Sequence, residues 1–152
     1  MNKPILSLII PVYNEEENII PLLERIDLFI KIPLRIYFIY DSENDPTVSV
    51  IKNCKNHKNP IELVKNIYGA GALNAIKTGF ETFHEEACVV IMADGSDDLS
   101  TINGMYGLYC QGFHIVCASR YMRNGRQFGG GLFKKLLSGL AGKSLYWLTK
   151  MP

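Results

Sequence analysis

Long apolar runs and cysteine motifs are both missing from this sequence of 152 residues. Without 18 consecutive apolar residues, we expect no transmembrane helix. The N-terminal apolar run reaches Pro11 and several glutamates without a small-residue cleavage site, which predicts a strand rather than a signal peptide. The cysteines have spacings unlike those of metal or redox motifs, so we expect reduced core thiols in a cytoplasmic protein, at Cys54, Cys88, Cys110 and Cys117.

Acidic residues are missing from the last third of the chain. All 15 Asp and Glu residues lie within residues 1–98, together with nine Lys and Arg residues, whereas residues 99–152 hold seven Lys and Arg residues. The two parts carry net charges of −6 and +7, behind a formal net charge of +1. Such a basic segment predicts an anionic partner, and charge alone leaves open a phosphate, a nucleic acid or a lipid surface.

Motifs of covalent catalysis are missing as well. The sequence has no Gly-x-Ser-x-Gly, and its three histidines are scattered. The glycines of "YGAGALNAIKTGF" fail the spacing of a phosphate-binding loop, so we expect them to bring a helix close to a sheet.

Apolar runs alternate with helical patterns along residues 5–119. The predicted strands cover residues 5–10, 35–40, 61–64, 87–92 and 114–119, and the predicted helices cover residues 15–30, 45–56, 71–83 and 99–110. This alternation predicts an α/β fold with a largely parallel sheet. We expect the first strand to stop at Pro11, Asn14 to cap the first helix, and strand 87–92 to be buried on both faces.

Polar residues gather where three of these strands end, in "PVYNE", "YDSEND" and "MADGSDD". Ligands of parallel sheets bind outside the carboxyl ends of the strands, so we expect a site there. The carboxylates of Asp94, Asp97 and Asp98 would repel one another without a cation, and Mg²⁺ or Mn²⁺ suits such oxygen ligands. The alternative is a capping turn with Asp98 or Ser100 as N-cap, and both interpretations can hold together.

Charged groups also mark the ends of the second and the last predicted strand. Asp41 can accept hydrogen bonds from a base or ribose, whereas a helix cap explains Asp45 well. Arg120 can pair with phosphate oxygens at the end of the last strand.

The C-terminal region has a composition of its own. We expect a core domain over residues 1–122, and a basic flexible loop with an amphipathic helix over residues 123–152. The helix pattern of residues 132–150 favours either packing on the domain or association with a membrane surface.

Five motifs occur in order: "LSLIIPVYNEEENI", "IYDSENDPT", "GAGALNAIKTGF", "VVIMADGSDD" and "VCASRY". Together they resemble the family-two, inverting glycosyltransferases of the GT-A fold, and among these the dolichyl- or polyprenyl-phosphate sugar (mannose) synthases. The resemblance covers essentially the whole chain. It implies a Rossmann-like, three-layer sandwich around a largely parallel sheet.

The resemblance also implies roles for matching residues. Asp94 and Arg120 would be catalytic, and Asp94, Ser96 and Asp97 would hold Mg²⁺ or Mn²⁺. The donor would be bound by Pro11, Tyr13, Glu15, Ile39, Asp41, Met92, Ala93, Asp94, Ser96 and Arg120.

The implied reaction transfers a sugar from a nucleotide-diphosphate sugar to a polyprenyl or dolichyl phosphate, with inversion, in the cytoplasm or at the membrane surface and without a nucleic-acid partner. The alternatives are a family-two transferase for cell-surface polysaccharide and a nucleotide-sugar-binding fragment without turnover. Met92 replaces the first aspartate of the family's D-x-D motif, and Tyr40 replaces the first aspartate of its V-D-D-G-S motif. Because the family's later D-x-T-S-G-F-R segment is missing, we expect a C-terminally truncated chain.

Overall fold

The structure, a computed structural model, describes residues 5–54, 56–119, 144 and 147. The chain divides into two units, residues 1–114 and residues 115–152. In the second unit, Ser144 and Trp147 are helical and exposed. No helix of the described residues is long and apolar enough to cross a membrane.

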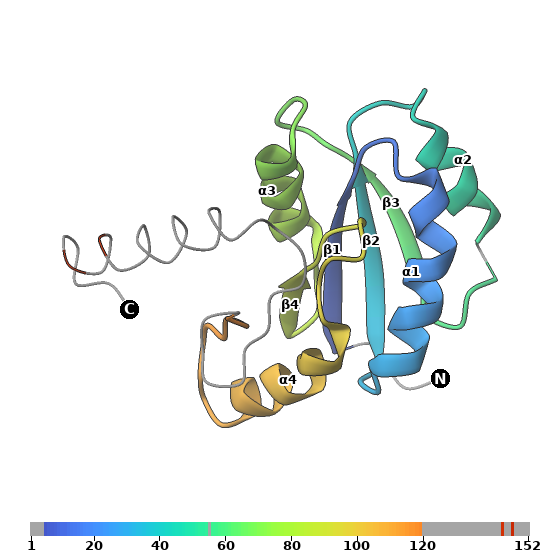
Figure 1. The fold of residues 1–152 in the computed structure, drawn as a ribbon. Coiled ribbons are helices and arrows are strands. Elements are labelled where there is room, and N and C mark those ends of the chain that lie inside the picture. The colour runs from blue at the N-terminus through green and yellow to red at the C-terminus, as the bar shows by residue number, and fades with distance from the viewer. Residues whose placement is uncertain (1–4, 55, 120–143, 145–146, 148–152) are drawn as a thin grey trace. The chain divides into compact units, whose positions relative to one another are not determined.

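The first unit is built around one parallel sheet (Figure 1). Its strands are β1 (Leu6–Val12), β2 (Leu34–Tyr40), β3 (Ile61–Lys65) and β4 (Ala87–Val90), in the order β3-β2-β1-β4. All three neighbouring pairs are parallel, so the carboxyl ends of the strands meet at one edge. The predicted α/β fold with a parallel sheet is confirmed.

Helices form layers on both faces of this sheet (Figure 1). On one face lie α1 (Glu16–Phe29) and α2 (Pro46–Asn53), and on the other lies α3 (Ala72–Thr82). A 3₁₀ helix, η1 (Leu99–Thr101), leads into α4 (Ile102–Cys110), and its Leu99 joins the core beneath α1.

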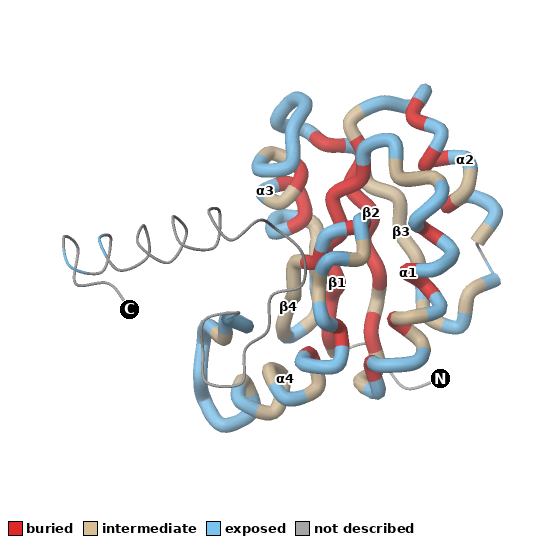
Figure 2. The backbone as a smooth tube through the Cα atoms, in the orientation of Figure 1, coloured by how far each residue is buried: buried red, intermediate tan, exposed pale blue. Residues whose placement is uncertain are grey.

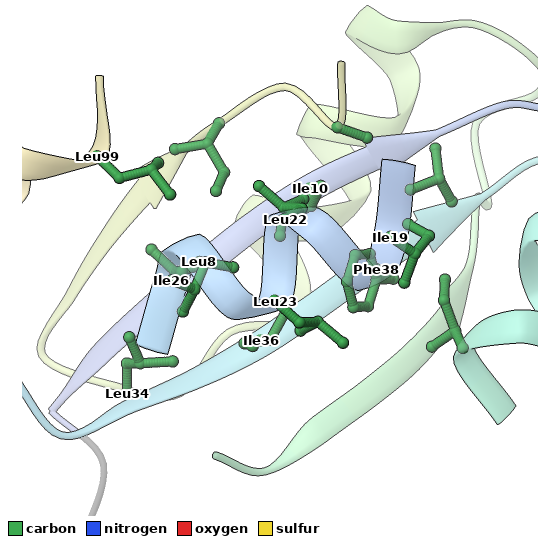
Figure 3. Close-up of a cluster of buried hydrophobic side chains, with 14 of the residues drawn as sticks. Leu8, Ile10, Ile19, Leu22, Leu23, Ile26, Leu34, Ile36, Phe38 and Leu99 are labelled. Atoms are coloured by element: carbon green, nitrogen blue, oxygen red, sulfur yellow. The ribbon is translucent and has the colours of Figure 1, made fainter. Parts of the chain in front are cut away.

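Figure 2 shows that β1 and β2 are buried along most of their length. Alternate residues of these strands enter different cores. Leu8 and Phe38 pack against α1, together with Ile10 and Ile36 (Figure 3). Ile9 and Ile39 face α3 and pack with Ala75. Because both faces are covered, these strands are apolar without interruption, as buried parallel strands are.

β1 runs through Pro11, where the sequence predicts that the strand ends. Pro11 pairs in register with Ile39 of β2. Ile91 N–H donates to the Ile9 carbonyl at 3.1 Å, and the next hydrogen bond on this side would need an N–H from Pro11. The proline therefore ends the β1–β4 ladder rather than β1 itself.

The predicted cap of α1 is also wrong. The N-cap is Glu15, without a side-chain cap. Asn14 precedes it with a φ of 53°, where it turns the chain between β1 and α1.

β4 is shorter and less buried than predicted. It ends at Val90 and lies at the edge of the sheet, so all four of its residues are half-buried rather than buried on both faces. On α3, Thr78 is buried while Phe80 is 50% exposed.

The predicted strand over residues 114–119 does not form. These residues have no regular structure, and the Ile115 side chain is 84% exposed. An apolar run becomes a strand only when a neighbour takes its backbone hydrogen bonds, and the described sheet ends at β4. The four cysteines are free thiols, but none is fully buried, and Cys110 and Cys117 are exposed rather than in the core.

Candidate functional site

The loop after β1 is held by the first turn of α2. Asp45 is buried and accepts a hydrogen bond from Thr47 N–H at 2.9 Å, which makes it the predicted N-cap. Its carboxylate also accepts the Asn14 N–H at 3.1 Å, and Thr47 Oγ1 accepts the Glu15 N–H at 2.8 Å. Burial raises the pKa of Asp45, but the hydrogen bonds from Thr47 and Asn14 outweigh it and lower the pKa below its ordinary value.

The loop after β3 is held by Asp41 at the end of β2. One carboxylate oxygen accepts Asn66 Nδ2–H at 2.8 Å, and the other accepts Gly71 N–H at 2.8 Å. Asn66 is itself buried and accepts the Thr78 hydroxyl of α3 at 2.9 Å. A ribose or base that binds Asp41 would therefore meet a carboxylate already engaged on both oxygens.

The loop after β4 carries the clustered aspartates. Asp94 accepts the Ser96 N–H at 2.9 Å, and Asp97 accepts the Met92 N–H at 2.8 Å. Asp98 caps η1, accepting Ser100 N–H at 3.1 Å, so the capping interpretation is confirmed for this residue. The aspartates thus divide between shaping the loop and starting the next helix.

Arg25 of α1 reaches this loop from the side. It donates to the carbonyls of Gly95 and Asp97, both at 2.8 Å. Arg25 and Asp94 also line a pocket of about 220 Å³, together with Asn18, Pro21, Leu22, Ala93 and Gly95.

The negative charge at the carboxyl edge of the sheet suits a cation that binds together with a phosphate ligand. Hydrogen bonds from Ser96 hold the pKa of the exposed Asp94 carboxyl below its ordinary value, so it is ionised at neutral pH. The described residues contain no group of three or more His, Cys, Asp or Glu side chains that could hold a metal. A Mg²⁺ or Mn²⁺ ion that shares phosphate oxygens needs only one or two protein carboxylates. The residues present therefore fit an ion bound jointly with a diphosphate.

The predicted site residues are distributed unevenly over this edge. Tyr13 is 67% exposed beyond β1, Glu15 is half-exposed, and Asp94, Ser96 and Met92 are exposed in the β4 loop. Three others, Pro11, Ile39 and Ala93, are buried, so little of their side chains faces solvent. Arg120 lies outside the described residues.

Asn66, Thr78 and Arg25 were not singled out from the sequence. Asn66 stands directly after β3, as Asp41 stands after β2, and this equivalent position was the available signal. No sequence pattern could have identified Arg25, because it binds backbone carbonyls that lie 70 and 72 residues away along the chain.

The known proteins that this chain resembles point to one family. The model of the family Glycosyl transferase family 2 matches residues 7–148. An uncharacterized glycosyltransferase of Synechocystis sp. is 29% identical over 140 residues, which cover 87% of this chain and 44% of that protein. A dolichol-phosphate mannosyltransferase of Pyrococcus furiosus is 28% identical over 133 residues, covering 87% of this chain and 38% of that protein. The chain thus spans less than half the length of either relative.

Solved structures share the architecture. A mannosyltransferase of Pyrobaculum calidifontis, in complex with GDP-Man and Mn²⁺, matches with a TM-score of 0.52 at 23% identity. The match covers 62% of this chain and 28% of that chain. At this identity the likeness shows a common fold.

Proposed function

Because the chain belongs to glycosyl transferase family 2, we propose that it forms the donor-binding part of an enzyme that transfers a sugar from a nucleotide-diphosphate sugar to a polyprenyl or dolichyl phosphate, with inversion. Its fold is the GT-A fold, and its family is one of transferases. The donor, the acceptor and the roles of individual residues belong to the proposal.

The observation that carries the proposal is the arrangement at the carboxyl edge of the sheet. Hydrogen bonds join the loops after β1 and β3 to Asp45 and Asp41, which both follow β2. The loop after β4 adds the exposed, ionised Asp94. Ligands of parallel sheets bind at this edge, and a nucleoside diphosphate with a divalent cation matches its oxygen-rich chemistry.

Asp94 would hold Mg²⁺ or Mn²⁺ together with the donor diphosphate, and Ser96 and Asp97 would complete the ion's surroundings. When bound, the ion supplies positive charge to the leaving nucleoside diphosphate. Tyr13 and Glu15 would border the nucleotide, Asp41 would meet its ribose or base, and Arg120 would contact its phosphates.

The lipid-phosphate acceptor is supported by two considerations. A phosphate acceptor is already an anion, so it needs no general base to activate it. The similar Pyrococcus furiosus protein is named a dolichol-phosphate mannosyltransferase. We place residues 1–122 at the donor and residues 123–152 toward the acceptor and the cytoplasmic membrane surface.

Thermal unfolding in a panel of UDP-, GDP- and dTDP-sugars, with and without Mn²⁺, tests this proposal. We expect one nucleotide class to raise Tm by several degrees only when Mn²⁺ is present, because binding to the native state stabilises it. Asp94→Ala should abolish the Mn²⁺-dependent rise, since it removes the carboxylate that meets the ion.

Asp98→Asn is the matched control. It removes one negative charge from the same loop, while asparagine can still cap η1. The Mn²⁺-dependent rise should persist in this variant. A rise that survives in Asp94→Ala would contradict the role of Asp94, and no rise with any donor would contradict nucleotide-sugar binding.

A second candidate is nucleotide-sugar binding without turnover. It is favoured by Met92, which stands where the resembling family has a carboxylate. Donor binding without sugar transfer to polyprenyl phosphate would distinguish it from the first.

A further inference from the structure

We propose that Arg25 is a positioning residue that holds the loop of residues 94–97 in the shape needed for the cation and diphosphate. The inference rests on the proposed function for its ligand. Its structural part, the fixing of the loop by α1, stands on the contacts of Arg25 alone.

The guanidinium of Arg25 donates hydrogen bonds to the loop at two carbonyl oxygens. Nη1 donates to the Gly95 carbonyl and Nη2 to the Asp97 carbonyl, each at 2.8 Å. These carbonyls belong to the residues on either side of Ser96, so one planar group fixes both ends of a short turn. A guanidinium can bind two carbonyls at once because its N–H donors are held in a rigid, planar fork, whereas the donors of a lysine ammonium all lie on one nitrogen atom.

The contact between Arg25 and the loop requires a glycine at position 95. Its φ of +72° lies in the left-handed region, which side chains rarely adopt. A Cβ at this position would lie 2.9 Å from Arg25 Nη1. The glycine therefore allows both the turn and the close approach of the guanidinium.

Arg25 provides the hydrogen bonds that attach this loop to α1, since the other hydrogen bonds of the loop are internal. Asp94 binds the Ser96 N–H and Asp97 binds the Met92 N–H, which shape the loop without attaching it to the domain. The β1–β4 ladder has already ended at Ile91. Among the described residues, the hydrogen bonds that join residues 94–97 to another element are those from Arg25.

Arg25 also leaves the aspartates available. It binds carbonyl oxygens and, within the described part of the chain, forms no ion pair with Asp94 or Asp97. A guanidinium paired with these carboxylates would compete with a cation. Bound to the backbone instead, it orders the loop and keeps the carboxylate charge for the ligand.

Arg25→Met tests the proposal, because methionine keeps an apolar stem but removes the fork. We expect the Kd of Mn²⁺, measured in the presence of the nucleoside diphosphate that raises Tm, to rise at least about tenfold. Losses of this size follow when a residue that hydrogen-bonds to a metal-binding group is removed. Arg25→Lys should recover part of the loss. Lys77→Met, which removes one exposed charge from α3, should leave the Kd unchanged.

Two readouts separate positioning from a general loss of stability. Amide hydrogen exchange without ligand should accelerate at Met92 and Ser96 in Arg25→Met, while the core amides of β1 keep their protection. In an Asp94→Ala background, Arg25→Met should change the nucleotide Kd less than twofold, because the Mn²⁺-dependent binding is already lost.

Unchanged exchange at Met92 and Ser96 would overturn the proposal, as would a wild-type Kd in Arg25→Met. A wild-type protein that binds no nucleotide with Mn²⁺ would overturn the proposed function instead. Hydrogen exchange alone would then decide whether Arg25 fixes the loop.

Discussion

Glu85, just before β4, joins two neighbouring strands through one carboxylate. Its side chain is 7% exposed. It accepts Ser7 Oγ–H at 2.6 Å, Tyr37 O–H at 3.0 Å and Arg35 Nε–H at 2.9 Å. Burial raises the pKa of Glu85, but these hydrogen bonds outweigh burial and lower it below its ordinary value of 4.5.

This lowered pKa makes the stability of the protein depend on pH. The unfolded chain takes up the proton first as pH falls, so the stabilisation by Glu85 is complete above pH 4.5 and is lost on acidification below it. We expect Glu85→Gln to lower the free energy of unfolding by about 2–4 kcal/mol at pH 7, because buried donors lose a charged acceptor. Urea unfolding at several pH values measures the difference, which should shrink toward about pH 3.

Glu86→Gln is the control for this effect. Glu86 is the exposed neighbour of Glu85, and its replacement should change the free energy of unfolding by less than about 0.5 kcal/mol at either pH. A Glu85→Gln deficit that is the same at pH 7 and pH 3 would show that its charge is not what stabilises the fold.

At the scale of elements, α3 approaches the sheet closely at Gly79. A Cβ on Gly79 would lie 2.3 Å from Ile9 Cγ2 of β1. We expect Gly79→Ala to lower the free energy of unfolding by about 1–3 kcal/mol, because the core must shift to admit the methyl group. Denaturant unfolding measures this cost.

Gly104→Ala in α4 provides the comparison. A Cβ there meets no atom within 4 Å, so alanine should stabilise the protein by about 0.5–1 kcal/mol through helix propensity. Equal effects of the two substitutions would mean that the α3–β1 contact is not as close as described.

Local sequence patterns predicted most helices and strands. The predictions that failed concerned features that depend on contacts between distant segments. The helical pattern of residues 15–30 predicted α1, and the capping role expected of Asp45 predicted the start of α2. The strand over residues 114–119 failed because a strand needs a hydrogen-bonded neighbour, which an apolar run does not specify. Asn66 and Arg25 were missed because their contacts join distant segments.

At the scale of the whole molecule, charge separates along the chain. Residues 1–98 carry a net charge of −6 and residues 99–152 carry +7. Trp147, in the basic part, is 77% exposed. We predict cosedimentation with anionic phosphatidylserine vesicles at low salt and weaker cosedimentation at 0.5 M salt, because salt screens the attraction of basic residues to the surface.

Charge-matched variants make this prediction specific. Lys134→Gln with Lys135→Gln should weaken vesicle binding, whereas Lys52→Gln with Lys77→Gln, in the first unit, should not. Equal binding to neutral phosphatidylcholine vesicles, or none to anionic vesicles at low salt, would contradict a role for the basic segment at membranes.

The order of motifs along the chain predicted the architecture better than the site. The polar stretches that follow β1, β2 and β4 could be located from sequence, and the parallel sheet then placed them at one edge. Which carboxylates stay available there depends on partners that only the folded chain supplies. Asp45 and Asp41 are engaged by backbone and amide donors, whereas Asp94 remains exposed.

The position of β4 has a practical consequence for handling the protein. At the edge of the sheet that the described residues form, β4 is a segment without charge along Ala87–Val90, whereas the opposite edge strand, β3, carries Glu62 and Lys65. Charged side chains on an edge discourage unwanted strand addition between molecules. Among the strands that the structure describes, β4 is therefore the one at which self-association would begin, and a lysine introduced there would act against it.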